Sequence, residues 1–465
     1  MLLTLILVGL LIVVPVLLRK PEWGVTLVAV LIYCNFPFVL AKIYHIKLAN
    51  YATLVLGIAL IYAYIILYGD SVRGSARALL VLAAYYGGIF ISFVFSSVSD
   101  LDFLPVIRNL PDTTLGFALF YLIGDLRRVQ YAAGAIASTA FVLATLTVVQ
   151  HFLHLEGNIL GGLAQGSVEQ ILGHVSAWRP SGPIEDANFY AQTLLPGAAM
   201  LLGGLIYGKS YFWRAAAALA VSILLGAILL TASRGALLAV AAIILAFFWI
   251  ERKFILLAPV AVVGMVMLLV LVPSYVERVA AIFVALAHLV SGEPGGVEIS
   301  IAGRLNEMHA ALLTFLEHPW TGVGYGQFEG FYQAISARYD LMMRPADRSA
   351  HSLYFEVAAE QGIVGLGCLA VIMGSTFTAY SRAVACCVKA GEETAAAVIT
   401  SAGVGAFAYF VAALFLHDAY PRYGWVMIML GLAAERATRH LKLAAPANNA
   451  AQDGVREKKG VLSYG

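Results

Sequence analysis

Long apolar stretches separated by short polar segments run along most of the chain. A helix needs about 20 mostly apolar residues to cross the hydrocarbon core of a bilayer. Backbone groups in lipid must be satisfied within the segment, so helices are the expected spanning element. No alternation typical of barrel strands is present. The pattern predicts about 12 transmembrane helices, from the candidate spans 2–18, 24–41, 51–68, 79–97, 108–124, 129–152, 187–207, 215–232, 235–250, 254–272, 352–378, 396–416 and 423–436.

The composition supports a membrane protein. Of the 465 residues, 61% are hydrophobic and only 12% are charged, whereas an ordinary soluble protein carries about 25% charged residues. We therefore expect an all-α polytopic protein with membrane lipids as neighbours. The net charge of +2 gives no indication of a nucleic-acid partner. The four cysteines are scattered and lack zinc or redox spacing.

Positive charges predict which loops face the cytoplasm. The basic loops alternate with the others, which places the segments 153–186 and 273–350 on the outer side of the membrane. Lys20, Lys42 and Arg73 cannot all obey the rule, so the orientation of the first spans stays open. The basic positions on the cytoplasmic side are Arg127, Arg128, Lys209, Arg214, Arg252, Lys253, Arg382, Lys389, Arg436, Arg439 and Lys442.

Four regions follow from this organisation. Residues 1–272 form the N-terminal transmembrane helices, and residues 273–350 form one large loop. Residues 351–443 form the C-terminal transmembrane helices, and the polar tail 444–465 is expected to be a disordered cytoplasmic extension. The loop is expected to be partly helical, because its stretch from Ile301 to Glu317 has apolar residues at helical spacing just before Pro319.

The two outer segments contain arginines but no lysine. Arginine stays charged and presents a planar fork that matches phosphate oxygens, so this choice favours an anionic, diphosphate-bearing ligand. The alternative is ion pairing with the loop carboxylates Glu277, Glu307, Glu317, Asp340 and Asp347, and this is favoured for Arg278 and Arg338. The remaining outer arginines are Arg179, Arg304, Arg344 and Arg348.

Arg234 lies in a tight turn between two spans, within "TASRGALLAV". It could extend its charge to the interface, but a lone arginine on the outer side is an exception to the charge rule, and a cation at a helix start opposes the macrodipole. A functional role is favoured. In "RPSGPIEDANFYAQ", Asp186 or Asn188 could cap the next helix, which leaves Arg179 less well explained.

His351 stands where the arginine-rich loop enters an apolar helix. It could simply cap or pack at the helix start, or it could act as a base near neutral pH. His417 and the other histidines have weaker cases. No metal-ligand spacing is present, and "GVGYG" lacks the Lys-Ser/Thr of a phosphate-binding loop, so no metal or cofactor is expected.

Four stretches resemble the O-antigen ligase and O-antigen polymerase superfamily of bacterial inner-membrane proteins. They are "RPSGPIEDANFYA", "SRGALL" with an Arg-x3-Leu pattern, "GRLNEMHAALLTFLEHPWTGVGYGQF", and "HSLYFEVAAEQGIVGL" with a His-x10-Gly pattern from His351 to Gly362. Their order around the largest outer loop carries the resemblance, which covers residues 100–436.

The resemblance implies a GT-C-like, metal-independent and inverting glycosyltransferase. The donor would be a glycan on undecaprenyl diphosphate at the periplasmic face, and for a ligase of lipopolysaccharide biosynthesis the acceptor would be lipid A–core. By the same resemblance, Arg234 and Arg304 contact the diphosphate and His351 is the base. Arg179 is a further candidate for the diphosphate, and Arg344, Arg348 and Asn188 are possible additional substrate contacts.

Three alternatives to the ligase remain. A polymerase would extend a second lipid-linked glycan, and a protein O-oligosaccharyltransferase would use Ser or Thr side chains. The ligase is preferred because a single large arginine-rich outer loop precedes the histidine motif. A transporter would instead place ionisable groups near the bilayer midplane. An outward cleft floored by Arg234 and capped by the 273–350 loop would favour the enzyme.

Overall fold

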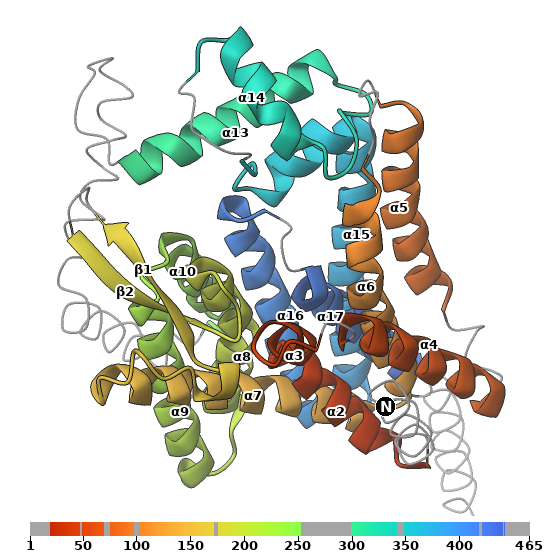
Figure 1. Ribbon diagram of the computed structural model, residues 1–465. Helices are drawn as coiled ribbons and strands as arrows, with labels where there is room; N and C mark the ends of the chain where they lie inside the picture. The colour runs from red at the N-terminus through yellow and green to blue at the C-terminus, as the bar shows by residue number, and fades with distance from the viewer. Residues whose placement is uncertain are drawn as a thin grey trace, which may run out of the picture.

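The computed structural model describes residues 19–46, 49–68, 75–96, 102–171, 175–252, 299–341, 348–417, 421–439 and 441. This part of the chain is almost entirely helical (Figure 1). The helices before the large loop are α2 (Pro21–Tyr33), α3 (Phe36–Lys42), α4 (Ala49–Tyr68), α5 (Ala76–Val94), α6 (Leu104–Leu122), α7 (Leu126–Phe152), α8 (Ala187–Tyr207), α9 (Tyr211–Leu230) and α10 (Arg234–Glu251). Those that follow are α13 (Ile299–Glu317), α14 (Phe328–Arg338), α15 (Leu353–Lys389), α16 (Glu393–Ala412) and α17 (Pro421–Ala437).

The helices coincide with the apolar stretches that predicted them, which confirms an all-α polytopic membrane protein. Among the described residues, seven helices are long and apolar enough to cross a membrane, or eight if α2 and α3 count as one span bent by 49°. The candidate spans 2–18 and 254–272 lie outside the described residues. The tail 444–465 lies outside them as well.

Helix α8 lies at the centre of the N-terminal bundle. It packs against α7, α9, α10 and α16, and most of its side chains are buried. Small residues allow this close approach: a Cβ atom on Gly197 would lie 2.4 Å from the Cβ of Ala140 on α7. Helix α17 is buried in the same way between α6, α15 and α16. Helices α8 and α17 therefore form the packed centre against which the other helices lie.

The segment between α7 and α8 contains an antiparallel hairpin, β1 (Gln165–Ile171) and β2 (Val175–Gly182). The sequence did not predict these strands. Polar residues such as Ser167, Glu169 and Gln170 dilute the apolar positions, so the segment lacks the strict alternation of a half-buried strand. The "RPSGPIEDANF" stretch begins within β2 and continues into α8, against which β2 packs.

The described part of the large loop forms α13 and α14, which confirms its partly helical character. Figure 1 shows both helices, with the first turns of α15, gathered over one end of the bundle. They share a small core of their own, built around Phe328, Tyr332 and Ile335 of α14 and Ala310 and Ala311 of α13. The loop is therefore a folded cap rather than a simple connection.

Helix α15 is interrupted at Gly362, which has φ 62° and ψ −156°. The turn that follows α13 fills the interruption with four backbone hydrogen bonds. Ile363 N–H donates to the carbonyl of Pro319 at 2.8 Å, and Val364 N–H to that of Trp320 at 3.2 Å. In the other direction, the N–H groups of residues 323 and 324 donate to the carbonyls of residues 359 and 360 at 3.0 and 2.9 Å.

This exchange satisfies the backbone groups that a broken helix exposes, as burial away from water requires. It also brings two glycines against the opposing backbone. A Cβ on Gly362 would lie 2.4 Å from the carbonyl carbon of Trp320, and one on Gly322 would lie 2.2 Å from that of Glu360. The glycine that ends the His-x10-Gly pattern thus attaches the loop helices to the first half of α15.

We predict that Gly362→Ala destabilises the protein. The added Cβ would clash with the Trp320 backbone, and the positive φ would cost about 1–3 kcal/mol for a residue with a side chain. Thermal unfolding in detergent measures the loss. Gly367→Ala is the matched control, because Gly367 lies in the same helix with no atom within 4 Å of an added Cβ. Equal unfolding temperatures for the two variants would contradict the role of the break.

Candidate active site at the start of helix α15

His351 lies at the junction between the loop and α15, in a left-handed backbone conformation with φ 48°. Histidine tolerates this region better than most residues, but the conformation still stores strain, which proteins retain mainly at functional sites. The next residues hold the junction in place, because Leu353 N–H donates to the carbonyl of Leu416 at 2.7 Å. The backbone therefore presents the imidazole in a fixed position before the helix begins.

A buried carboxylate faces the imidazole. Nε2 of His351 lies 3.2 Å from Oε2 of Glu307, a fully buried residue of α13. The second carboxylate oxygen, Oε1, lies 3.8 Å from Nε of Arg348. From the sequence, Glu307 was expected only as an ion-pair partner for the loop arginines. Its spacing of three residues from Arg304, which puts both on one helix face, was the signal that could have placed it in the site.

The surroundings keep His351 neutral. Burial lowers the pKa of His351 to about 3, and the nearby charges of Arg304 and Arg348 act in the same direction. Asp186 opposes this shift. The contact with Glu307 therefore joins a neutral imidazole to a carboxylate. A neutral imidazole carries its proton on one ring nitrogen and leaves the lone pair of the other nitrogen for another group.

His417 is the second histidine of the site, although its position in the sequence had offered a weaker case than that of His351. Its ring centroid lies 5.7 Å from that of His351 and 5.1 Å from that of Phe189, in edge-on arrangements. Burial lowers the pKa of His417, while the carboxylates of Glu329 and Asp186 raise it. His417 thus connects α8, the loop helices and the junction of α15.

Arg179 donates hydrogen bonds to other residues of the protein. This buried side chain of β2 donates from Nε to the carbonyl of Thr231 at 2.8 Å and from Nη2 to Oδ1 of Asn188 at 3.0 Å. Asp186 caps α8 through the N–H groups of Asn188 and Phe189, as the capping interpretation expected. These contacts hold the hairpin, the start of α8 and the turn after α9 together.

Arg234 is the first residue of α10, directly after that turn. The start of α10 packs against the short 3-10 helix η3 (Ala413–Phe415), where a Cβ on Gly235 would lie 3.1 Å from the Cβ of Phe415. Because η3 leads to Leu416 and His417, the Arg-x3-Leu stretch reaches the same region as His351.

The structure therefore brings the four resembling stretches to one place. His351, Arg304 and Arg348 form its centre with Glu307, and Arg179, Asn188 and Arg234 surround the adjoining turn. Arg344 lies outside the described residues. Arg338 instead pairs with Glu317 at 2.6 Å, as the ion-pair alternative expected. Among the described residues, no group of three or more His, Cys, Asp or Glu side chains could hold a metal ion.

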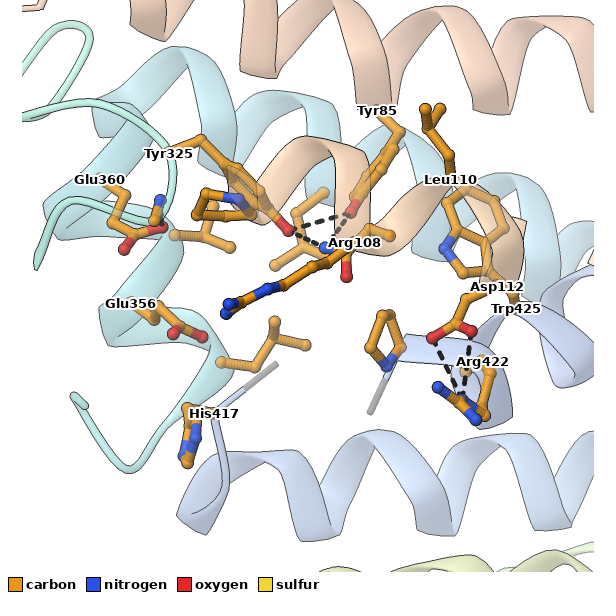
Figure 2. Close-up of a pocket in the computed structure, with 18 of the residues that line it drawn as sticks. Tyr85, Arg108, Leu110, Asp112, Tyr325, Glu356, Glu360, His417, Arg422 and Trp425 are labelled. Carbon is orange, nitrogen blue, oxygen red and sulfur yellow. Dashed lines mark hydrogen bonds and ion pairs between the residues drawn. The ribbon is translucent and has the colours of Figure 1, made fainter. Parts of the chain in front are cut away.

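A cleft of about 790 Å³ lies beside this centre (Figure 2). It runs between α5, α6, α15 and α17, and Tyr325, Gly326 and Glu329 of the loop border it. His417 lines the cleft, whereas Arg234 does not, so the expected floor of arginine is absent from it. The sequence had not singled out the charged residues that line it, which are Arg108, Asp112, Glu329, Glu356, Glu360 and Arg422.

Comparison with known proteins bears on this region. Residues 198–370 match a family model described as O-antigen ligase. The match confirms the resemblance to the O-antigen ligase and polymerase superfamily, and it includes Arg234, Arg304, Glu307 and His351. No curated protein matches the chain.

We predict that Arg179→Ala lowers the free energy of unfolding by about 1–3 kcal/mol, because the buried oxygens of Thr231 and Asn188 lose their donor. Thermal unfolding in detergent measures the change. Arg127→Ala, which removes an exposed arginine at the start of α7, serves as the control. An unchanged unfolding temperature for Arg179→Ala would show that this guanidinium does not stabilise the turn.

Proposed function

We propose that the protein is an O-antigen ligase that transfers a glycan from undecaprenyl diphosphate to lipid A–core. The match to the O-antigen ligase family supports a membrane enzyme of this superfamily. The observation that carries the finer proposal is the contact between His351 and the buried Glu307 in an arginine-rich site. A neutral histidine oriented by a carboxylate is the arrangement that a hydroxyl nucleophile needs.

In this proposal His351 removes the proton of the acceptor hydroxyl as the hydroxyl oxygen attacks the anomeric carbon of the donor sugar. The new C–O bond forms as the bond to the diphosphate oxygen breaks, and the electron pair leaves with the diphosphate. One displacement of this kind inverts the anomeric centre. The proton moves to the imidazole, and the carboxylate of Glu307 stabilises the imidazolium that results.

The diphosphate is a good leaving group whose developing charge needs fixed cations. We assign this role to Arg234 and Arg304, whose guanidinium groups suit phosphate oxygens. Arg348 shares Glu307 with His351, and Arg344 remains a possible further contact. The bonds of Arg179 to Thr231 and Asn188 favour a positioning role, in which both residues hold the turn that carries Arg234.

Donor binding would also tune the base. Positive charge near His351 contributes to its low pKa, so a diphosphate that neutralises Arg304 and Arg348 would raise that pKa. The imidazole would thus become a stronger base only when the donor is in place.

We infer that the reaction takes place at the periplasmic face of the bacterial inner membrane, where both lipid-linked substrates are present.

Reconstitution with a lipid-linked glycan and two competing acceptors tests the proposal. Lipid A–core should be consumed, and a second lipid-linked glycan should not. His351→Ala should abolish transfer without unfolding the protein, whereas His154→Ala, at an exposed position, should not. Transfer to the second lipid-linked glycan would indicate the polymerase instead, and full activity of His351→Ala would exclude His351 as the base.

We predict separate pH dependences for kcat/KM and kcat. The base must be deprotonated, and the lowered pKa of His351 keeps it so in the free enzyme down to about pH 3. The acid limb of kcat/KM, which reports the free enzyme, should therefore lie well below pH 6.5. The acid limb of kcat should lie at higher pH, because it reports the donor complex. Rates of purified protein between pH 5 and 8 test this, and an acid limb of kcat/KM near pH 6.5 would contradict it.

A further inference from the structure

We propose that the cleft between α5, α6, α15 and α17 binds the acceptor as a phosphorylated glycolipid, with Arg108 as the residue that holds its phosphate. This inference rests on the proposed transferase function and adds a second binding site to it. Family resemblance assigns residues to the donor diphosphate and the base, but none to the acceptor. The cleft has the size and the position that an acceptor requires, and it contains one arginine that is available to an anion.

Arg108 is the cation available for a ligand in the cleft. It lies on the first turns of α6, is exposed, and forms no ion pair or hydrogen bond with the described residues. Figure 2 shows its guanidinium pointing across the cleft, toward the side that carries Glu356. An arginine in this position, at the edge of an apolar span, can bind phosphate oxygens through two parallel N–H groups.

The other charged groups of the cleft have protein partners. Nε of Arg422 lies 3.1 Å from Asp112, and its Nη1 donates to Asn35. Glu360 accepts hydrogen bonds from the N–H groups of Gly326 at 2.7 Å and of Phe328 at 3.2 Å. Asp112 and Glu360 therefore hold the helices and the loop, whereas Arg108 is left to meet an anion.

The walls of the cleft suit an amphiphile. Close to Arg108, Asn109 donates to the hydroxyl of Tyr325, which lies 3.2 Å from that of Tyr85, and the ring of Trp425 stands edge-on to Tyr85 at 5.0 Å. Aromatic rings with polar tips can face both a sugar and an apolar chain. The remaining walls include apolar side chains of membrane-embedded helices, among them Leu54, Leu369, Ile372 and Ile428.

The position of the cleft separates the acceptor from the donor. Arg179, Arg234, Arg304 and Arg348 do not line it, whereas His417, which contacts His351, does. An inverting displacement needs the nucleophile on the side of the anomeric carbon opposite to the leaving group. A glycolipid in the cleft would approach the histidines from a side that is free of the proposed diphosphate arginines.

Two acceptors share the required chemistry. Lipid A–core offers phosphate groups on its lipid A, and a second lipid-linked glycan offers its diphosphate. The test uses lipid A–core, the same acceptor after removal of its phosphates, and a second lipid-linked glycan. For the acceptor that the wild-type protein uses, Arg108→Glu should raise KM about tenfold or more, as expected for a lost charge-assisted contact. The KM for the donor should not change.

The dephosphorylated acceptor makes the test specific. If Arg108 binds the phosphate, wild type should have a KM for this acceptor about tenfold higher than for the intact one, and Arg108→Glu should add no further loss. Arg108→Gln provides a second variant without the reversed charge. Arg127→Glu is the matched control, because it makes the same change at an exposed position outside the cleft. An equal loss of both forms of acceptor, or no loss, would overturn the proposal.

Direct binding separates this inference from the proposed function. Native mass spectrometry of the detergent-solubilised protein with each glycolipid needs no turnover. If wild type transfers to neither acceptor, the proposed function fails, but selective loss of the phosphorylated glycolipid in Arg108→Glu would still support the site. Binding of that glycolipid to Arg108→Glu with wild-type affinity would exclude the site even if transfer occurs.

Discussion

The break in α15 is the constraint on which the site depends. A helix that opens at Gly362 exposes backbone N–H and carbonyl groups, and these must find partners where water is scarce. The turn from Pro319 to Gly324 supplies them. Because the same turn ends α13, satisfying the break also fixes α13 against the start of α15. The contact between Glu307 and His351 is a consequence of this junction, and it could not persist if the two segments moved independently.

The electrostatics of the site follow from the junction. A buried carboxylate is costly unless it is paired, and Glu307 lies near both Arg348 and His351. The arginines in turn favour the neutral form of His351, as burial already does. The free site therefore holds an unprotonated imidazole beside arginines. In the proposed function, an anionic substrate that neutralises these arginines would strengthen the base.

Much of this architecture can be read from the sequence, because the positions of membrane helices follow from apolar length alone. The helical stretch from Ile301 to Glu317 and the cap at Asp186 are local signals of the same kind. The rest depends on distant segments. Whether Glu307 pairs with an arginine or faces His351 is decided by the docking of α13, and Arg179 was ambiguous until its partners on α8 and α9 were known. The hairpin before α8 lacks the alternation of apolar and polar residues that predicts a strand. Arg108 lies at the edge of an apolar span, where nothing in the sequence distinguishes it from an ordinary boundary charge.

The arrangement around the two histidines divides the molecule by chemistry. On one side, the hairpin, the start of α10 and α13 contribute Arg179, Arg234 and Arg304. On the other side, aromatic rings, apolar side chains, ion-paired groups and Arg108 line a cleft between the helices. A transporter would need one substrate path past this point, whereas a transferase needs two that end at one reacting carbon. His351 contacts Glu307 of the first side and His417 of the second. In the proposed reaction, a base at that boundary would take a proton from one lipid-linked substrate while the arginines hold the leaving group of the other.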